Sequence, residues 1–465
     1  MRNNNVTKRS ALLVASIGSF LTPFMASSLN IALPRIGDEF GMDAILLSWV
    51  ATSYLLSAAV FLVPFGRFAD IHGRKRIFSI GILVYTAASF FCAVSGFPGF
   101  LIAARVVQGI GGAMIFGTSI AIITSVFPPG ERGKAIGINV AAVYLGQSVG
   151  PVVGGFMTYH FGWRSIFFMN VPLGILMFVL ITMFLKAEWA EAKGAKFDVV
   201  GSAIYAATLV AIMYGLSILP ALSGGILIAV GLLCLAGFAV WESRSKSPVL
   251  DVSLFRGNRT FTLSSAAALI NYGATAAVGF LLSIYLQDVR GLDPDYAGIV
   301  MISQPLIQAI FSPFAGRLSD RIEPRIVASA GMGLCAAGLV LFAFVSAGTS
   351  IYLIVAGLVL LGFGFALFSS PNTNAIMSSV EKRHYGVASG MVGTMRLVGM
   401  MLSMGIAMLL ISVFVGHVKV AQAPDQFISA MRTGFAVFAA LCFAGIFASL
   451  ARGRLRKKHK NGNKI

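Results

Sequence analysis

The sequence predicts an all-α integral membrane protein that crosses the bilayer fourteen times, as two six-helix bundles with two further helices inserted between them. Hydrophobic residues make up 57% of the 465 residues and charged residues only 11%, which is more apolar surface than a soluble fold of this length can bury. Apolar runs of about 20 residues follow one another along the chain. A Gly-Arg-x-x-Asp sequence also occurs twice, starting at Gly66 and at Gly316, each time after an even-numbered run. This repetition indicates an internal duplication of the kind found in transporters.

Each run is long enough to cross a hydrocarbon layer of about 30 Å as a helix. The first six predicted spans are 11–33, 46–66, 77–96, 100–122, 135–158 and 164–186. A polar stretch with Lys186, Glu188 and Lys193 separates them from the inserted pair, 198–219 and 223–242. After a second charged stretch, the last six spans are 260–286, 296–315, 325–346, 351–371, 386–413 and 431–451. The expected domains are therefore a bundle at 1–190, linker helices at 191–258, a second bundle at 259–452 and a basic tail at 453–465.

The distribution of basic residues sets the expected orientation. If the N-terminus lies inside, 28 of the 35 lysines and arginines fall on cytoplasmic segments, as the positive-inside rule requires. We therefore expect a multi-pass protein of a prokaryotic inner (plasma) membrane with both termini in the cytoplasm. The net charge of +18 is then a matter of topology, and no nucleic-acid partner is expected. The tail 453–465 is interpreted as an orientation signal, with binding to acidic lipid as the alternative.

The sequence argues against catalysis and against a bound metal or cofactor. The cysteines lie in different apolar runs without metal-binding spacing: Cys92, Cys234, Cys335 and Cys442. Such residues are typical of helix packing. No cluster of His, Asp, Glu or Ser converges at one membrane depth, which argues against a membrane-embedded enzyme. The short loops leave no room for the soluble output domain of a sensor.

The loop 66–76 has the residues of a conformational lock. Asp70 and Arg74 can pair with each other and with helix ends, because a carboxylate is stabilised at a helix N-terminus. The glycines permit a sharp turn. A basic loop that only sets topology would need neither the glycines nor the aspartate. The predicted lock residues are Gly66, Asp70, Gly73, Arg74, Arg76, Gly316 and Asp320.

Spans 4 and 5 each carry an unusual pattern. Arg105 lies inside span 4 with Gln108 and Gly109 one turn further on and on about the same face, where Gln108 provides a hydrogen-bond partner. An arginine in a span must face protein or water. We therefore expect these three residues to relay charge during coupling, with snorkelling of Arg105 to the interface as the alternative. Span 5 combines a proline with small residues that allow close helix approach: Gly146, Gly150, Pro151, Gly154 and Gly155.

Together these motifs resemble those of major facilitator superfamily transporters, in particular the fourteen-span drug:proton antiporter family that contains multidrug and tetracycline exporters. The 66–76 loop resembles the superfamily loop motif, Arg105 to Gly109 the span-4 motif, and Gly146 to Gly155 the antiporter motif. Other similar stretches are 30–34, 162–174, 197–201 and 254–261. The resemblance implies the major facilitator fold, and export of amphiphilic compounds, antibiotics among them, by alternating access in exchange for protons.

One departure weakens the implied proton coupling. The family's span-1 motif usually places an aspartate where this chain has Met25. All seventeen acidic residues, and all five histidines, fall in loops or at helix ends. A proton carrier needs a titratable group that faces both sides in turn. Proton coupling is thus implied by the resemblance alone.

Polar side chains within spans are the candidates for substrate binding: Asn30, Tyr54, Gln147, Asn271, Tyr272, Gln304, Gln308 and Asn374. Interhelical hydrogen bonding is the alternative role for each of them. The expected partners are a small amphiphilic substrate, protons and membrane lipid, and the expected state is a monomer. Because Arg105 and Arg396 are the only formal charges inside spans, export of a lipid or an anionic metabolite with little proton coupling is the rival function.

Overall fold

The structure is a computed structural model, and it describes residues 2–453 apart from 43, 220, 246, 251–252, 293 and 417–422. The rest of the predicted basic tail, 454–465, lies outside the described residues. Within the described residues, fourteen helical segments are long and apolar enough to cross a membrane. The predicted number of spans is therefore confirmed.

The helices follow the predicted order. The first six spans are α1 (Arg2–Phe40), α2 (Ala44–His72), α3 (Arg74–Ala93), α4 (Pro98–Val126), α5 (Arg132–Phe161) and α6 (Arg164–Phe184). The inserted pair is α7 (Val199–Ser217) and α8 (Leu222–Arg244), followed by the short α9 (Ser253–Gly257). The last six spans comprise α10 (Arg259–Thr275), α11 (Ala277–Ile284), α12 (Pro294–Met301), α13 (Ser303–Arg321), α14 (Pro324–Ala343), α15 (Ile351–Ser378), α16 (Tyr385–Phe414) and α17 (Pro424–Ala451).

Two spans of the second bundle are interrupted where the sequence predicted continuous helices. Span 9 consists of α10, α11 and a π-helical turn at Tyr285–Val289, and span 10 consists of α12 and α13. Many helices also extend beyond the apolar runs; α1, for example, begins at Arg2 although its run begins near residue 11. Hydropathy reports the part of a helix that lies in hydrocarbon, and the polar residues beyond it continue the helix.

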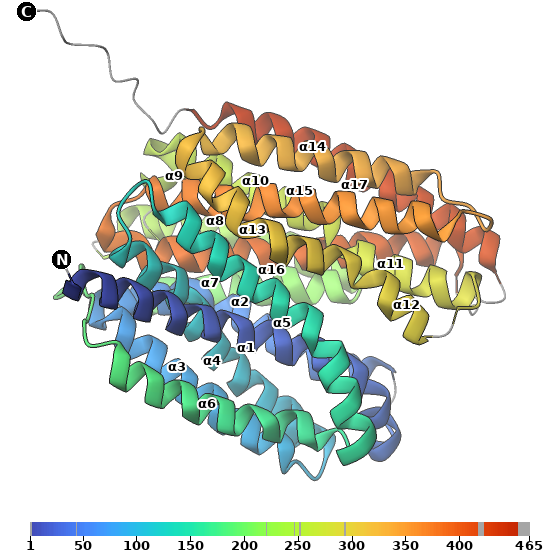
Figure 1. The fold of residues 1–465 in the computed structure, drawn as a ribbon, viewed down its shortest axis with the longest axis horizontal. Helices are drawn as coiled ribbons and strands as arrows, with labels where there is room; N and C mark the ends of the chain where they lie inside the picture. The colour runs from blue at the N-terminus through green and yellow to red at the C-terminus, as the bar shows by residue number, and fades with distance from the viewer. Residues whose placement is uncertain are drawn as a thin grey trace, which may run out of the picture.

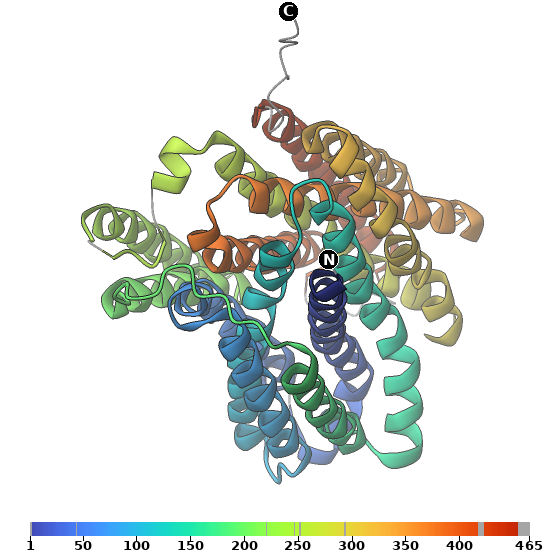
Figure 2. The ribbon, with the colours of Figure 1, turned by 60° about the vertical axis from the view of Figure 1, so that its left-hand side comes forward.

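The two bundles meet mainly along two pairs of helices. Figure 1 shows α1, α3, α4 and α6 on one side of the molecule and α10, α14, α15 and α17 on the other. Between them, α5 packs against α1 of its own bundle and α13 of the other, and α2 packs against α16. The inserted helices α7 and α8 pack on each other, and α7 contacts α2 and α16. In Figure 2 this green pair lies at the edge of the molecule.

Candidate functional site

Asp70, at the end of α2, joins the first bundle to the second. Its carboxylate forms a fully buried ion pair of 2.6 Å with Arg74. It also accepts hydrogen bonds from the backbone nitrogen of Gly386, at 2.9 and 3.0 Å, and from that of Val387, at 3.2 Å. These nitrogens belong to the first turn of α16, where free N–H groups and the helix dipole both favour a carboxylate. The aspartate therefore caps a helix of the opposite bundle.

Arg74 has further contacts on both sides of the same junction. It donates a hydrogen bond of 2.7 Å to Ser125 Oγ on α4 and another to the carbonyl oxygen of Lys382. Its guanidinium lies 5.2 Å from the ring centroid of Tyr385. Arg132 of α5 donates a hydrogen bond of 2.8 Å to the hydroxyl of that tyrosine. The role of Tyr385 could not be predicted from the sequence, because no local pattern links this residue to the 66–76 loop.

Asp320, at the end of α13, makes the equivalent contact in the other direction. It accepts hydrogen bonds of 2.9 Å from the backbone nitrogens of Gly133 and Lys134, in the first turn of α5. Among the described residues, no cation lies within ion-pair distance of Asp320, and its side chain is only half-buried. The two caps are therefore similar in geometry and unequal in charge pairing. We call this end of the molecule, with Asp70 and Asp320, the closed end.

Glycines allow the bundles to approach closely there. A methyl group on Gly66 would overlap the carbonyl oxygen of Gly386, and one on Gly316 would overlap that of Gly133. Gly73 has φ +113° and faces the carboxylate of Glu188, which accepts hydrogen bonds from the backbone nitrogens of Lys75 and Arg76. The side chain of Arg76 is exposed. Of the seven predicted lock residues, the structure places six at the closed-end contacts, while Arg76 contributes only its backbone.

Arg105 is almost completely buried and has partners within the first bundle. Its Nε donates to the carbonyl oxygen of Val50 at 2.9 Å, and an Nη atom donates to the side chain of Gln108. The guanidinium lies 4.5 Å from the ring centroid of Tyr54. Gln108 in turn donates a hydrogen bond of 2.7 Å to Ser89 Oγ. Gly109 lets α4 approach α2, since a methyl group there would crowd the backbone oxygen of Tyr54. The expected pairing of Arg105 with Gln108 is confirmed, and snorkelling is not observed.

The small-residue face of α5 packs against α1. Ser28 Oγ donates a hydrogen bond of 2.9 Å to the carbonyl oxygen of Gly150, and side chains on Gly146 or Gly154 would collide with the backbone of α1. Gly155 and Pro151 lie away from this contact, since Gly155 has more room and Pro151 is exposed. Met25 is buried on α1, and its sulfur accepts a hydrogen bond of 2.8 Å from Asn170.

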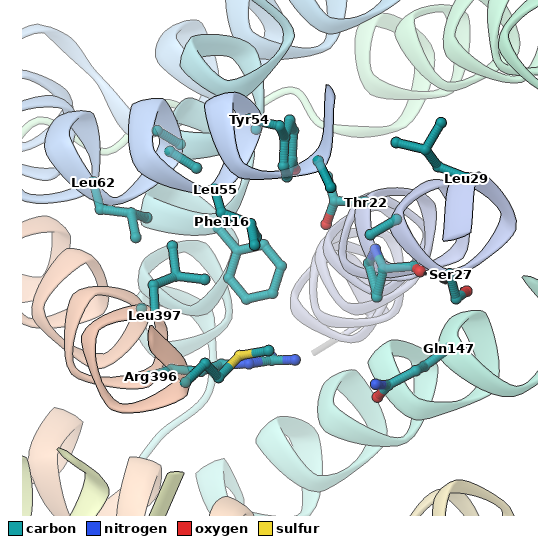
Figure 3. A pocket seen from close by; sticks show the side chains of 18 of the residues that line it. Thr22, Ser27, Leu29, Tyr54, Leu55, Leu62, Phe116, Gln147, Arg396 and Leu397 are labelled. Carbon is teal, nitrogen blue, oxygen red and sulfur yellow. Dashed lines mark hydrogen bonds between the residues drawn. The ribbon is translucent and has the colours of Figure 1, made fainter. Parts of the chain in front are cut away.

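Two adjoining cavities lie between the bundles. The first has a volume of about 220 Å³, and three of the predicted substrate residues line it: Asn30, Tyr54 and Gln147. The second has a volume of about 200 Å³ and is lined by Gln147, Tyr272, Gln304 and Gln308. The cavities share Gln147, Arg396 and Met400. Figure 3 shows Arg396 extending from α16 toward the space between Phe116 and Gln147.

The remaining two candidates lie elsewhere. Asn271 is buried with its amide nitrogen 3.9 Å from Cys442 Sγ, and Asn374 donates a hydrogen bond of 3.0 Å to Ser319 Oγ. Neither lines one of the two cavities, and both make the interhelical contacts that were the alternative for every polar residue in a span. The cavity residues that the sequence candidates omitted include Arg396, Tyr144 and Phe116. Only Arg396 carried a local signal, as the second charge inside a span.

The cavities lie well inside the molecule and have no acidic lining. At about 1.5 Å per helical residue, Arg396 lies about 15 Å along α16 from Gly386, and Gln147 about 21 Å along α5 from Gly133. Both residues therefore lie near the middle of their helices, which are 30 residues long each. The residues that line the two cavities include no aspartate or glutamate. The only ionised side chains there are Arg105 and Arg396.

A family model described as Major Facilitator Superfamily matches residues 15–241 and 264–465. The chain belongs to the major facilitator superfamily. It is 31% identical to the riboflavin transporter RibZ of Clostridioides difficile, over 94% of this chain and 96% of the relative. It is 32% identical to the multidrug resistance protein Stp of Mycobacterium tuberculosis, over 85% and 74%, and 29% identical to the tetracenomycin C resistance and export protein of Streptomyces glaucescens, over 88% and 76%.

Solved structures of the superfamily share the fold. The human organic anion transporter MFSD10 superposes with a TM-score of 0.68 at 14% identity, covering 95% of this chain and 99% of that one. The proton:xylose symporter XylE gives the same TM-score at 14% identity, covering 96% and 95%. At these identities the likeness shows the major facilitator fold, with the two inserted helices of this chain in addition to its two six-helix bundles.

Proposed function

We propose that this transporter exports amphiphilic small molecules across a prokaryotic inner membrane by alternating access. The observation that carries the proposal is the pair of adjoining cavities between the bundles, close to the depth of the membrane midplane. Their walls combine leucine, phenylalanine and methionine with amides, hydroxyls and arginine, and such a lining suits molecules with both apolar and polar parts. The cavities would serve as the binding site for the transported molecule.

The closed end supplies the conformational element. Asp70 and Asp320 each cap a helix of the opposite bundle, so both caps must release before the bundles can separate at that end. Most basic residues of the loops belong to this end, which supports a cytoplasmic position for it and for both termini. The cavities would then face the outside in this state, and release of the caps would open them to the cytoplasm.

The relatives support export of amphiphiles and leave a choice of substrate. Two of them are named for drug resistance and export, whereas RibZ is named as a riboflavin transporter. Riboflavin is itself a planar ring system with a polar chain, so the same type of cavity would serve both. The absence of carboxylates from the cavity lining supports transport with little dependence on the proton gradient.

Transport assays in inverted membrane vesicles test the proposal. The vesicles would carry the full chain or no transporter, and the panel would contain neutral, anionic and cationic fluorescent amphiphiles and riboflavin. We expect accumulation of at least one amphiphile above the empty-vesicle level, and its loss in Asp70→Asn vesicles of equal protein content. Accumulation of none of these compounds would overturn the proposal.

A further inference from the structure

We propose that Arg396 and the hydroxyl of Tyr144 form an anion-binding subsite that holds the acidic head of an amphiphilic substrate, while the first cavity takes its apolar body. This inference rests on the proposed function and specifies its substrate class. The substrate would be an organic monoanion with a carboxylate, sulfonate or phosphate group on an aromatic or alkyl body.

Arg396 is the cation of the cavities that has no anionic or hydrogen-bonding partner among the described residues. Its contacts are with two rings, at 5.7 Å from the centroid of Phe116 and 5.6 Å from that of Tyr272. Arg105, the other cation, already donates to Val50 and Gln108 and lies almost fully buried. An unpaired guanidinium at this depth is costly, and a bound anion would offset the cost. Of the two arginines, Arg396 is therefore the one with all of its donors available to a ligand.

The groups around Arg396 in the second cavity are suited to an anion. Tyr144 is 3% exposed and lines this cavity. Its hydroxyl makes no well-formed hydrogen bond among the described residues, although the hydroxyls of Tyr272 and Ser369 lie close to it. The polar lining also contains the amides of Gln147, Gln304 and Gln308 and the hydroxyls of Tyr272 and Thr275, and no carboxylate competes with a ligand. A hydroxyl and amide N–H groups can all donate to an anion, and hydrogen bonds to a charged acceptor are the stronger ones.

The first cavity supplies the apolar complement. Its walls include Leu55, Leu62, Phe116 and Leu397, all on the same side of the cavity as Arg396 in Figure 3. Because Arg396 lines both cavities, a molecule bound through it can place its body among these side chains and its head among the donors. The two-part lining therefore selects for an acidic head joined to an apolar body.

The test uses three probes that share one fluorophore and differ in head charge: dansylglycine (anionic), dansylamide (neutral) and dansylcadaverine (cationic). Binding is measured by fluorescence titration of the purified full chain in nanodiscs of neutral lipid. For the native protein we expect the order anion, neutral, cation in falling affinity. Arg396→Gln should weaken the binding of dansylglycine about tenfold to a hundredfold, as expected for the loss of charge-assisted hydrogen bonds, and should change the affinity for dansylamide by no more than about twofold. The affinity of Arg396→Lys for dansylglycine should lie between those of the native protein and Arg396→Gln, because lysine keeps the charge but lacks the planar, forked guanidinium.

Two further variants separate binding from folding. Tyr144→Phe removes only the hydroxyl and should weaken dansylglycine about fivefold with no change for dansylamide, consistent with one hydrogen bond to a charged group. Arg244→Gln, at the exposed end of α8, removes a positive charge away from the cavities and should match the native protein. Equal losses for all three probes in Arg396→Gln, or no preference for the anion in the native protein, would overturn the subsite.

Competition distinguishes the two sources of an acidic amphiphile. Displacement of dansylglycine by naphthalene-1-sulfonate in preference to oleate would assign the site to aromatic acids, and the reverse order to fatty acids. Displacement by neither would count against the subsite. Vesicle transport of the three dansyl probes separates this inference from the proposed function. Transport of the probes without a charge preference would contradict the subsite alone. If neither these probes nor any other amphiphile is transported, both the subsite and the proposed function are contradicted.

Discussion

The carboxylate of Asp70 accepts hydrogen bonds of 2.9 and 3.0 Å from the backbone nitrogen of Gly386, which lies 316 residues further along the chain. The same carboxylate is neutralised by Arg74 within a fully buried pair. A single side chain thus closes a contact between bundles, and its charge is balanced within its own loop. This combination makes Asp70 the most sensitive position of the closed end.

Asp70→Asn should cripple transport without preventing membrane insertion. The change leaves Arg74 buried without its counter-charge, and breaking a buried pair in this way costs about 3–5 kcal/mol. The closed end should therefore open more readily, and the transporter should no longer alternate properly between its two states. Transport per unit of protein in vesicles is the measurement, and a native rate at equal abundance would contradict the role assigned to Asp70.

Asp320→Asn should also reduce transport, but by less than Asp70→Asn does. Asp320 is half-buried and has no ion pair among the described residues, so the loss is limited to its hydrogen bonds to Gly133 and Lys134, about 1–2 kcal/mol. Side-by-side transport assays of the two variants test the order. A larger defect in Asp320→Asn than in Asp70→Asn would show that the ion pair does not set the strength of the cap.

Gly386→Ala should hold the bundles apart at the closed end. The added methyl group would collide with the carbonyl oxygen of Gly66, whereas Gly348→Ala, at an open position, provides the control. Spin labels on α2 and α16 would report the separation by electron paramagnetic resonance. We expect a longer distance in Gly386→Ala and the native distance in Gly348→Ala. Identical distances in all three proteins would argue against tight glycine packing at this junction.

Transport should depend weakly on the proton gradient and disfavour permanent cations. No acidic residue lines the cavities, so there is no carboxylate to exchange a proton for a cationic substrate. Dissipating the pH gradient in vesicles with an ionophore should change transport of a neutral or anionic amphiphile by less than a factor of about two, since a strong dependence needs a titratable group that carries the proton from one side to the other. Strong proton-driven transport of ethidium-like cations would defeat this prediction.

The helix cap of α7 should make stability depend on pH. Burial of Asp198 alone would raise its pKa, but hydrogen bonds from the backbone of Gly201 and the side chains of Ser245 and Trp241 hold that pKa below its ordinary value. A lowered pKa stabilises the folded state above the unfolded value of about 3.9. This stabilisation is lost as the pH falls through the lower, folded-state pKa.

Asp198→Asn should therefore lower the melting temperature at pH 7, and this difference should shrink at about pH 3, which lies below the unfolded pKa of about 3.9. Trp241→Phe, which removes one of the donors, should have a smaller effect in the same direction. Thermal unfolding of the purified protein at both pH values is the measurement. Equal differences at the two pH values would exclude the carboxylate charge as the cause.

Hydropathy and local spacing predict the spans and the short-range contacts, because both depend on neighbouring residues. The pairs Asp70–Arg74 and Arg105–Gln108 are separated by one helical turn and appear as expected. The contact of Asp70 with Gly386 joins two bundles and has no local signature. The side-chain directions of Asn271 and Asn374 could not be predicted either. A membrane helix is apolar on nearly all faces, so its sequence does not determine how it is rotated about its own axis. Arg396 could have been included from charge alone.

The helices that receive the two caps are the same helices that carry the groups shared by both cavities. On α5, the amides held by Asp320 and the side chain of Gln147 belong to one continuous helix, and on α16 the amides held by Asp70 and the side chain of Arg396 do so as well. A ligand that tilts either helix moves its capped end directly. Because the ligand contacts the middle of each helix and the cap holds its end, binding in the cavities can affect the closed end through the helix itself. No chain of intervening side chains is needed to connect the two.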